Sequence, residues 1–356
     1  MLKLLFISTP VGALGTGQGG GVELTIQNIA QELQKRGYKI EVVAPAGSVL
    51  QNIPVREIPG NLQVAVQTQG RDIPISLPSN SVLANMLDHV RQVQQQYDLI
   101  VNFAFDWLPF YLTPFFEIPI AHFISMGSMS EALDQIMTTI ARDYPKNIGV
   151  YTKSQADTFP FADTCHILSS AIDLSLYEFV PNPGKSIAWL GRIAPEKALE
   201  DAVAAVNLTG TPLKIYGKIQ DPDYWQQIQQ DFPHAPIEYK GFLATKQLQE
   251  ELGKCRALLM TPRWVEAFGN VAIEALACGV PVIAYGRGGP AEIVRDGVTG
   301  FLVEPDSVEG LVTAINQIDL INRNNCRQQA EAEYSLTSLG DRFAAWFDQI
   351  LQTKPS

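Results

Sequence analysis

The chain has 356 residues, more than one hydrophobic core usually serves, so the length predicts two domains. A net charge of −11 argues against a protein that binds nucleic acid phosphates or rests on an anionic membrane surface. The four cysteines lack paired spacing, which argues against a disulfide framework or a zinc site and favours a cytoplasmic location.

A β-α-β unit opens the chain. We expect strands at 3–8 and 39–44 with a helix at 22–36 between them, the pattern of a Rossmann-like domain. Six glycines fall between Gly12 and Gly21. Their spacing fits a dinucleotide-binding loop only weakly, because no acid ends the second strand to hold a ribose. The loop is either a flexible surface loop or a place where the backbone approaches a phosphate.

An aromatic cluster follows a predicted buried strand at 98–103. Core packing is the preferred interpretation, because aromatic side chains mostly serve burial. The alternative is a stacking wall for a flat acceptor, with Asp106 as a polar contact and Trp107 within the wall. No chemistry is assigned to the polar, proline-containing stretch 53–77.

The next predicted strand, 118–124, carries His122. A histidine inside an apolar strand is more often a satisfied core residue than a catalytic one. The serines that follow, from Ser125 to Ser130, either bind an acceptor or cap the next helix, and capping is the expected role of Ser130.

The second half opens with a strand at 187–190, followed by Arg192 and Lys197. Two cations five residues apart at the carboxyl end of a strand can clamp a diphosphate. A lysine at a helix start opposes the helix dipole, so a bound anion explains it better than a solvent-exposed position does.

A loop and a short helix separate predicted strands at 258–260 and 282–285. Gly269 and Asn270 open the helix, so its free backbone N–H groups can face a phosphate. Glu274 lies within the helix, where it can accept two ribose hydroxyls, and Glu266 lies in the loop. Each glutamate taken alone is also explained as an ordinary surface acid.

The run Glu266, Ala267, Phe268, Gly269, Asn270 and Glu274, continuing to Gly279, resembles the signature of the retaining glycosyltransferases of family four. This resemblance implies an α/β GT-B fold, two Rossmann-like domains that face each other across a cleft. The expected acceptor domain is 1–172, joined by a helix at 338–356 that crosses back to it. The expected nucleotide-sugar domain is 173–337.

The resemblance also implies roles for single residues. Glu266 and His122 would meet the transferred sugar as the catalytic pair. The donor would be held by these residues: Gly20, Gly21, Arg192, Lys197, Phe268, Gly269, Asn270 and Glu274. The family needs no metal and no cofactor, because the cations and the helix N-terminus neutralise the leaving diphosphate.

The segments 6–23 and 102–130 resemble the cyanobacterial pteridine glucosyltransferases. This likeness implies a UDP-glucose donor and a small pterin acceptor such as tetrahydrobiopterin, with Asp106, Trp107 and Ser125 on the acceptor side. The acidic charge predicts no nucleic acid partner, and with the lack of a basic amphipathic helix it predicts no stable membrane association. The oligomeric state is left open.

Two alternatives remain at this point. The same donor motifs would serve a family-four transferase that acts on a polysaccharide or a lipid-linked sugar. A nucleotide-binding module without catalysis is the second alternative, and the complete set of charged motif residues argues against it.

Overall fold

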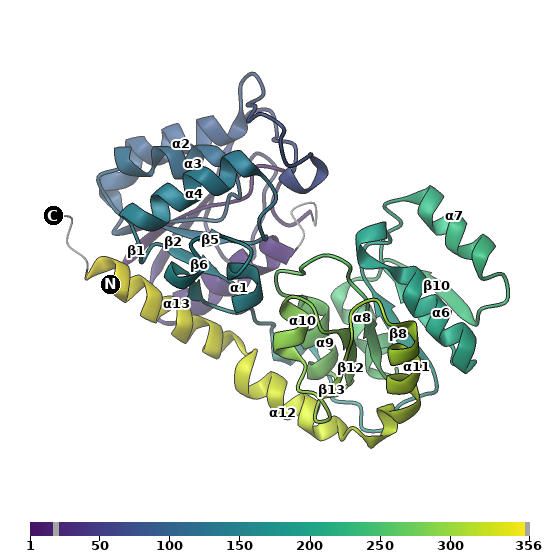
Figure 1. Ribbon diagram of the computed structural model, residues 1–356. Coiled ribbons are helices and arrows are strands. Elements are labelled where there is room, and N and C mark those ends of the chain that lie inside the picture. Colours follow the sequence, from purple (N-terminus) through teal and green to yellow (C-terminus); the bar gives the residue numbers. More distant parts are fainter. Residues whose placement is uncertain (17–20, 353–356) are drawn as a thin grey trace. The chain divides into compact units, whose positions relative to one another are not determined.

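The structure is a computed structural model that describes residues 1–16 and 21–352. The chain forms two compact units, each with its own parallel sheet covered by helices (Figure 1). The first unit is Met1–Ser170 with Leu336–Ser356, and the second is Ala171–Ser335.

The described residues of the first unit hold a seven-stranded sheet in the order β3-β2-β1-β4-β5-β6-β7. Its strands are β1 (Lys3–Ile7), β2 (Lys39–Pro45), β3 (Val55–Ile58), β4 (Leu99–Asn102), β5 (Ile120–Ile124), β6 (Ile148–Val150) and β7 (His166–Ile167). The central strands are mostly apolar, as expected where helices cover both faces of a parallel sheet.

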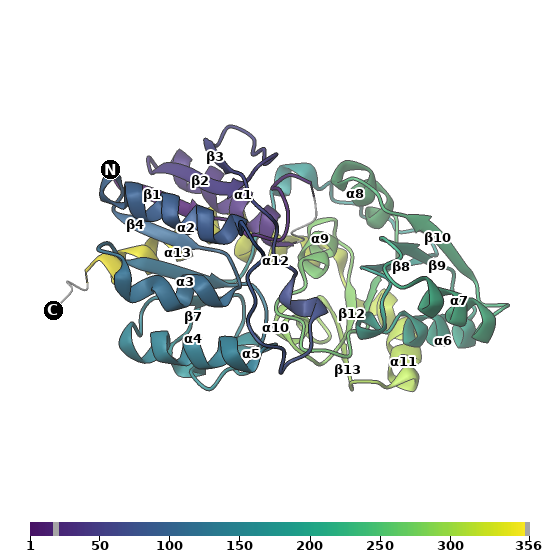
Figure 2. The same cartoon turned by 90° about the horizontal axis from the view of Figure 1, so that it is seen from above.

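Helices cover this sheet in two layers. They are α1 (Gly21–Lys35), α2 (Val82–Val93), α3 (Trp107–Leu112), α4 (Glu131–Asp143), α5 (Lys153–Ala156) and α13 (Leu336–Leu351). In Figures 1 and 2, α2, α3 and α4 lie side by side, whereas α1 packs with α13. The last helix belongs to the core, because the rings of Phe343 and Phe123 lie 5.4 Å apart.

The second unit has a six-stranded sheet in the order β10-β9-β8-β11-β12-β13. Its strands are β8 (Ile187–Leu190), β9 (Leu213–Tyr216), β10 (Ile237–Gly241), β11 (Leu258–Met260), β12 (Val282–Tyr285) and β13 (Gly300–Val303). Its helices are α6 (Leu199–Thr209), α7 (Pro222–Asp231), α8 (Thr245–Gly253), α9 (Asn270–Ala277), α10 (Gly289–Ile293), α11 (Val308–Gln317) and α12 (Arg323–Glu333).

Each sheet begins in its middle and is built outward in both directions. In the second unit the chain leaves β8 toward β9 and β10, then returns to add β11 on the other side of β8. This order creates a switch point between β8 and β11, and ligands of open parallel sheets bind at such points. No helix among the described residues has the length and apolar content that crossing a membrane requires.

Candidate functional site

The switch point of the second unit brings two predicted motifs together. The loop after β8 carries Arg192 and ends in a 3-10 turn, Pro195–Lys197. The loop after β11 carries Glu266 and leads into α9. Because β8 and β11 are neighbours in the sheet, both loops leave the same edge.

Lys197 and Glu266 form an ion pair between Nζ and Oε2, with side chains only 19% and 17% exposed. Trp264 donates its indole N–H to the same carboxylate oxygen at 3.0 Å. The ammonium also lies 4.9 Å from the centre of the Trp264 ring, within the range of a cation-π contact. The expected phosphate-binding cation is therefore held beside the expected sugar-binding carboxylate.

Arg192 is held differently from Lys197. Its guanidinium pairs with Glu196 at 3.1 Å and donates to Gln220. The two predicted cations thus lie on one loop, but each is bonded to a different acceptor in this structure.

Ala198 explains how the chain turns after Lys197. Its φ of 44° is left-handed, a conformation that glycine adopts at less cost. The helix expected to start at Lys197 therefore begins only at Leu199, after the 3-10 turn. Ala198 is completely buried, so its surroundings hold the strained turn in place.

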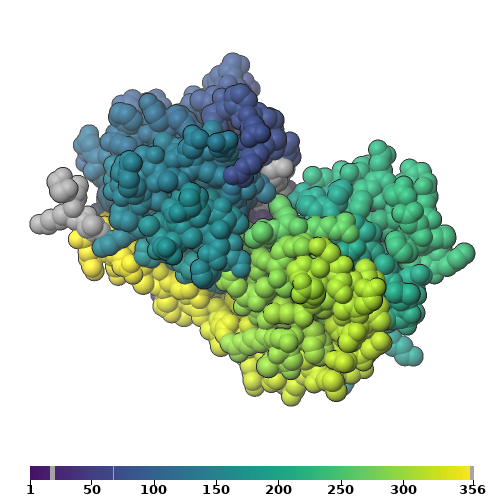
Figure 3. Space-filling view, in the orientation of Figure 1, coloured from purple at the N-terminus to yellow at the C-terminus, as the bar shows by residue number. Residues whose placement is uncertain are grey.

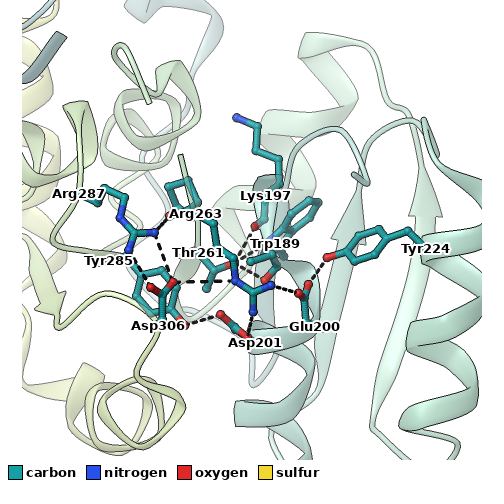
Figure 4. A network of polar contacts seen from close by, with 12 residues as sticks. Trp189, Lys197, Glu200, Asp201, Tyr224, Thr261, Arg263, Tyr285, Arg287 and Asp306 are labelled. Carbon is teal, nitrogen blue, oxygen red and sulfur yellow. Dashed lines mark hydrogen bonds and ion pairs between the residues drawn. The ribbon is translucent and has the colours of Figure 1, made fainter. Parts of the chain in front are cut away.

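A polar network fixes the two loops to each other (Figure 4). Arg263 donates to Glu200 at 2.5 Å and to Asp201 at 2.8 Å, and its backbone N–H donates to Glu196 O at 2.9 Å. Thr261 Oγ1 donates to Lys197 O at 3.0 Å. Neither Arg263 nor Thr261 was expected to have a role, since their acceptors lie more than 60 positions away and no local pattern reveals them.

Two glycines allow the Glu266 loop to pack on the loop after β12. A Cβ on Gly288 would lie 2.6 Å from Glu266 N and O, and one on Gly289 would lie 2.2 Å from Phe268 O. Gly289 N–H donates to Glu266 O at 2.7 Å. These contacts allow no side chain, which gives a physical reason for glycine at both positions.

Helix α9 begins where the sequence predicts it. Gly269, with φ of 97°, precedes the helix, and Asn270 is its first residue. The Asn270 Oδ1 atom is buried without a hydrogen-bond partner. Phe268 is 4% exposed and packs against Tyr334, so its ring belongs to the core and its backbone lies beside the helix start.

Glu274 lies one turn into α9, where Tyr177 donates to its Oε1 at 3.2 Å. Burial of the carboxyl raises the pKa of Glu274 to about 7, and the Tyr177 hydrogen bond offsets part of that rise. The carboxyl therefore changes its charge near neutral pH.

His122 corrects one prediction. It is completely buried in β5, with Nδ1 3.2 Å from Asn102 Nδ2 and Nε2 2.9 Å from Thr113 Oγ1. Its ring stacks on Phe110 at 4.4 Å, and burial lowers its pKa to about 3. An imidazole with no exposed surface and two bonded nitrogens cannot contact a sugar here. His122 is a satisfied core residue.

The other predicted residues of the first unit lie at loop and helix starts. Gly21 is the first residue of α1, and Gly20 lies outside the described residues. Ser125 follows β5 and is partly exposed. Ser130 precedes α4, but its side chain makes no capping hydrogen bond, so that expectation was wrong.

Asp106 and Trp107 begin α3. The Asp106 carboxylate caps this helix by accepting from Leu108 N at 3.3 Å, and burial raises its pKa. The Trp107 ring stacks on Tyr111, with centroids 4.5 Å apart. Both residues line a pocket within the first unit. Among the described residues, no three His, Cys, Asp or Glu side chains are grouped as metal ligands.

Comparisons with known proteins agree with the fold and the motifs. Residues 179–334 match the family model of the glycosyl transferases group 1. The chain is 27% identical over 395 residues to a D-inositol 3-phosphate glycosyltransferase of Mycobacterium marinum, covering 94% of this chain and 82% of that one. It is 32% identical over 142 residues to an exopolysaccharide phosphotransferase of Streptomyces coelicolor, but it spans only 15% of that protein's length.

Two solved structures resemble the whole chain. Anabaena HepE in complex with UDP has a TM-score of 0.78 at 19% identity, over 98% of this chain and 100% of that one. Sucrose-phosphate synthase from Thermosynechococcus elongatus has a TM-score of 0.78 at 17% identity, over 99% and 100%.

The two Rossmann-like sheets and these neighbours confirm the expected α/β GT-B fold. The protein is an enzyme of the glycosyltransferase class. Over residues 179–334, its second unit is similar to the group 1 glycosyltransferases.

Proposed function

We propose that this enzyme moves a hexose, glucose, from a UDP-sugar to a small acceptor with retention of anomeric configuration. The proposed acceptor is a pterin such as tetrahydrobiopterin. The observation that carries the donor half is the ion pair of Lys197 and Glu266 at the switch point, in the same unit as the α9 start and Glu274. A structural neighbour in complex with UDP and glucose supports the choice of donor.

The second unit offers a separate group for each part of a nucleotide sugar. The open N–H groups at Gly269 and Asn270 face a phosphate in this proposal, and the ionised carboxylate of Glu274 accepts two ribose hydroxyls. Lys197 neutralises the leaving diphosphate, with Arg192 as a second cation. No metal or cofactor is needed for this charge balance.

Donor binding then rearranges the ion pair. A diphosphate carries more negative charge than Glu266 and competes with it for the Lys197 ammonium. The released carboxylate is free to accept sugar hydroxyls or to stabilise positive charge that develops on the sugar ring. In this proposal Glu266 is the catalytic residue and Lys197 has two alternative anionic partners.

A second acceptor class has its own support. The Mycobacterium relative acts on an inositol phosphate according to its name, and the Streptomyces relative on an exopolysaccharide. Transfer to a phosphorylated polyol, a polysaccharide or a lipid-linked sugar is therefore the alternative. A module without catalysis is disfavoured, because the ion pair and the α9 start are both intact.

The test is mass spectrometry of purified protein incubated with UDP-glucose and tetrahydrobiopterin. Controls lack one substrate or use the Glu266→Ala protein. We expect a hexosylated pterin that depends on Glu266, and NMR of the product then reports the anomeric configuration. Slow UDP release without a pterin product would overturn the acceptor and keep the donor. Failure to bind or consume UDP-glucose would overturn both.

A further inference from the structure

The stretch 61–81, which we call the roof segment, is a closed surface loop of the first unit. Its ends meet, because Asn61 N donates to Asn80 O at 2.8 Å and Val82 N donates to Asn61 O at 2.9 Å. In the space-filling view its dark blue atoms lie on the surface of the first unit (Figure 3). A long loop without a strand or an α-helix of its own is usually functional in a compact domain.

Arg71 attaches the roof segment to the start of α4. Its guanidinium donates to Asp134 Oδ2 at 2.9 Å and to Ser128 Oγ at 2.8 Å. The Glu131 N–H donates to Arg71 O at 3.2 Å. The segment is thus held where its two ends meet and again at Arg71, and it encloses space between these two attachments.

A pocket of about 190 Å³ lies beneath the roof segment. Side chains from that segment form most of its wall, and Asp106, Trp107, Ser130 and Leu133 complete it. Pockets for drug-sized ligands usually measure about 300–1,000 Å³. The smaller volume suits one compact ring system better than an oligosaccharide or a lipid chain.

Gln63 lines the pocket and carries an acceptor atom that has no hydrogen-bond partner. The residue is 8% exposed, and its Nε2 donates to Asp106 Oδ2 at 2.9 Å. Its Oε1 is buried without a hydrogen-bond partner. A buried polar atom without a partner is destabilising, so a ligand N–H or O–H that bonds to it is stabilising.

The lining also sets the charge and shape of the ligand. Among the residues that line the pocket there is no Lys, Arg or His, and Asp106 is its acidic member. A phosphate or carboxylate would therefore meet no cation and would face the buried Asp106 side chain. Trp107 provides a partly exposed flat ring, which favours an aromatic partner.

We propose that the pocket beneath the roof segment binds a flat, uncharged heteroaromatic ring, which stacks on Trp107 and donates a hydrogen bond to Gln63 Oε1. This inference rests on the proposed function in one respect, that the bound ring is the sugar acceptor. Binding itself needs no donor and is tested separately. Phosphorylated polyols do not belong to this ligand class, so we expect that they do not bind in the pocket.

The test is calorimetric titration of the full-length protein with biopterin, without UDP-glucose. The variants are Gln63→Met, which removes the free acceptor, and Trp107→Leu, which removes the ring. Gln92→Met is the matched control, because Gln92 Nε2 also donates to an aspartate at 2.8 Å, but on the exposed surface of α2. Thermal melting of each variant reports whether its fold is intact.

We expect one biopterin per chain and about a tenfold loss of affinity in Gln63→Met and in Trp107→Leu, with Gln92→Met unchanged. Inositol 1-phosphate should neither bind the pocket nor displace biopterin. The inference is overturned if wild-type protein does not bind biopterin, if folded Gln63→Met and Trp107→Leu bind it normally, or if inositol 1-phosphate displaces it.

Transferase assays on the same proteins separate the two proposals. Biopterin binding that depends on Gln63 and Trp107, without any hexosylated product, would refute the proposed acceptor and support the pocket. A hexosylated pterin formed by Gln63→Met and Trp107→Leu with wild-type KM would refute the pocket and support the proposed function.

Discussion

Lys197 and Glu266 are 69 positions apart in the sequence, yet the Lys197 ammonium contacts the Glu266 carboxylate at the switch point of the second sheet. Both side chains are less than one fifth exposed, so solvent screens their attraction only partly. In the proposed function, the pair places a cation for a leaving diphosphate directly beside a carboxylate for a sugar. Under that proposal, one contact links two chemical requirements of glycosyl transfer.

Replacement of this lysine should reduce the rate far more than the stability. We expect Lys197→Met to lower kcat with UDP-glucose by about 10²- to 10³-fold, the usual effect of losing one preorganised charge-stabilising group. Lys214→Met is the matched control, because Lys214 pairs with Glu251 in the same unit at 3.1 Å and with similar exposure. Steady-state kinetics and urea unfolding measure the two effects.

A similar loss of stability in both lysine variants, with a rate loss only in Lys197→Met, is the expected pattern. Equal rates in the two variants would show that the Lys197 charge does not act on the diphosphate.

Donor binding should depend on pH through Glu274. Its pKa is raised to about 7 by burial, so the carboxyl gains a proton as the pH falls below that value. A protonated carboxyl accepts the ribose hydroxyls less well than a carboxylate. We expect the affinity for UDP to fall by up to about tenfold per pH unit below pH 7. Glu274→Gln should bind UDP weakly and without this dependence, as calorimetry at pH 5.5–8 can measure.

The same carboxyl also affects folding stability. Its pKa in the unfolded chain is about 4.3, so between about pH 4.3 and 7 the native state binds more protons. Stability therefore decreases as the pH rises through this window, by at most about 4 kcal/mol. Glu274→Gln should remove this slope in urea unfolding measurements, and a slope that survives the substitution would assign it to another group.

The loop that carries Glu266 should be sensitive to Gly289. An alanine there would place Cβ 2.5 Å or less from Phe268 backbone atoms, which cannot move without displacing the loop. We expect Gly289→Ala to cost about 1–3 kcal/mol of stability and to weaken UDP binding. In the control Gly286→Ala, the nearest atom is Val303 O at 3.5 Å, an ordinary contact. Similar melting temperatures for the two variants would contradict this account.

The sequence was sufficient to predict the features that depend on local patterns. Short apolar runs alternating with amphipathic helices predict parallel sheets, and the structure confirms the α/β fold. Gly269 and Asn270 lie at the start of α9 as their position before an apolar helix indicates. The turn after Lys197 was not predicted. Alanine usually avoids the left-handed backbone conformation, so its residue type does not indicate that Ala198 adopts it.

Features that depend on distant partners could not be predicted. The ring of His122 is held by Asn102 and Thr113, and no local pattern shows that both its nitrogens are bonded. The roof segment had no assigned chemistry, since its pocket arises only when Gln63 meets Asp106, 43 positions away. Charged motifs therefore indicated the Lys197–Glu266 site, whereas the pocket beneath the roof segment became visible only through tertiary contacts.

The role of His122 can be tested by separating activity from stability. We expect His122→Gln to lower stability by about 1–3 kcal/mol at pH 7.5, because Asn102 or Thr113 loses a buried partner. The activity of the folded fraction should stay within about twofold of wild type, since a core side chain stabilises ground and transition states equally. Exposed His234 provides the control substitution His234→Gln, which should change neither quantity.

The pH dependence gives a second readout for His122. Burial lowers its native pKa to about 3, whereas the unfolded value is about 6.5, so between these values the unfolded chain binds more protons. The contribution of His122 to the free energy of unfolding is fully present above about pH 6.5. It decreases as the pH falls, by at most about 1.4 kcal/mol per pH unit. His122→Gln should lose this acid sensitivity in urea unfolding at pH 5–8. A large loss of kcat in a stably folded His122→Gln protein would instead show that the imidazole reaches the substrate.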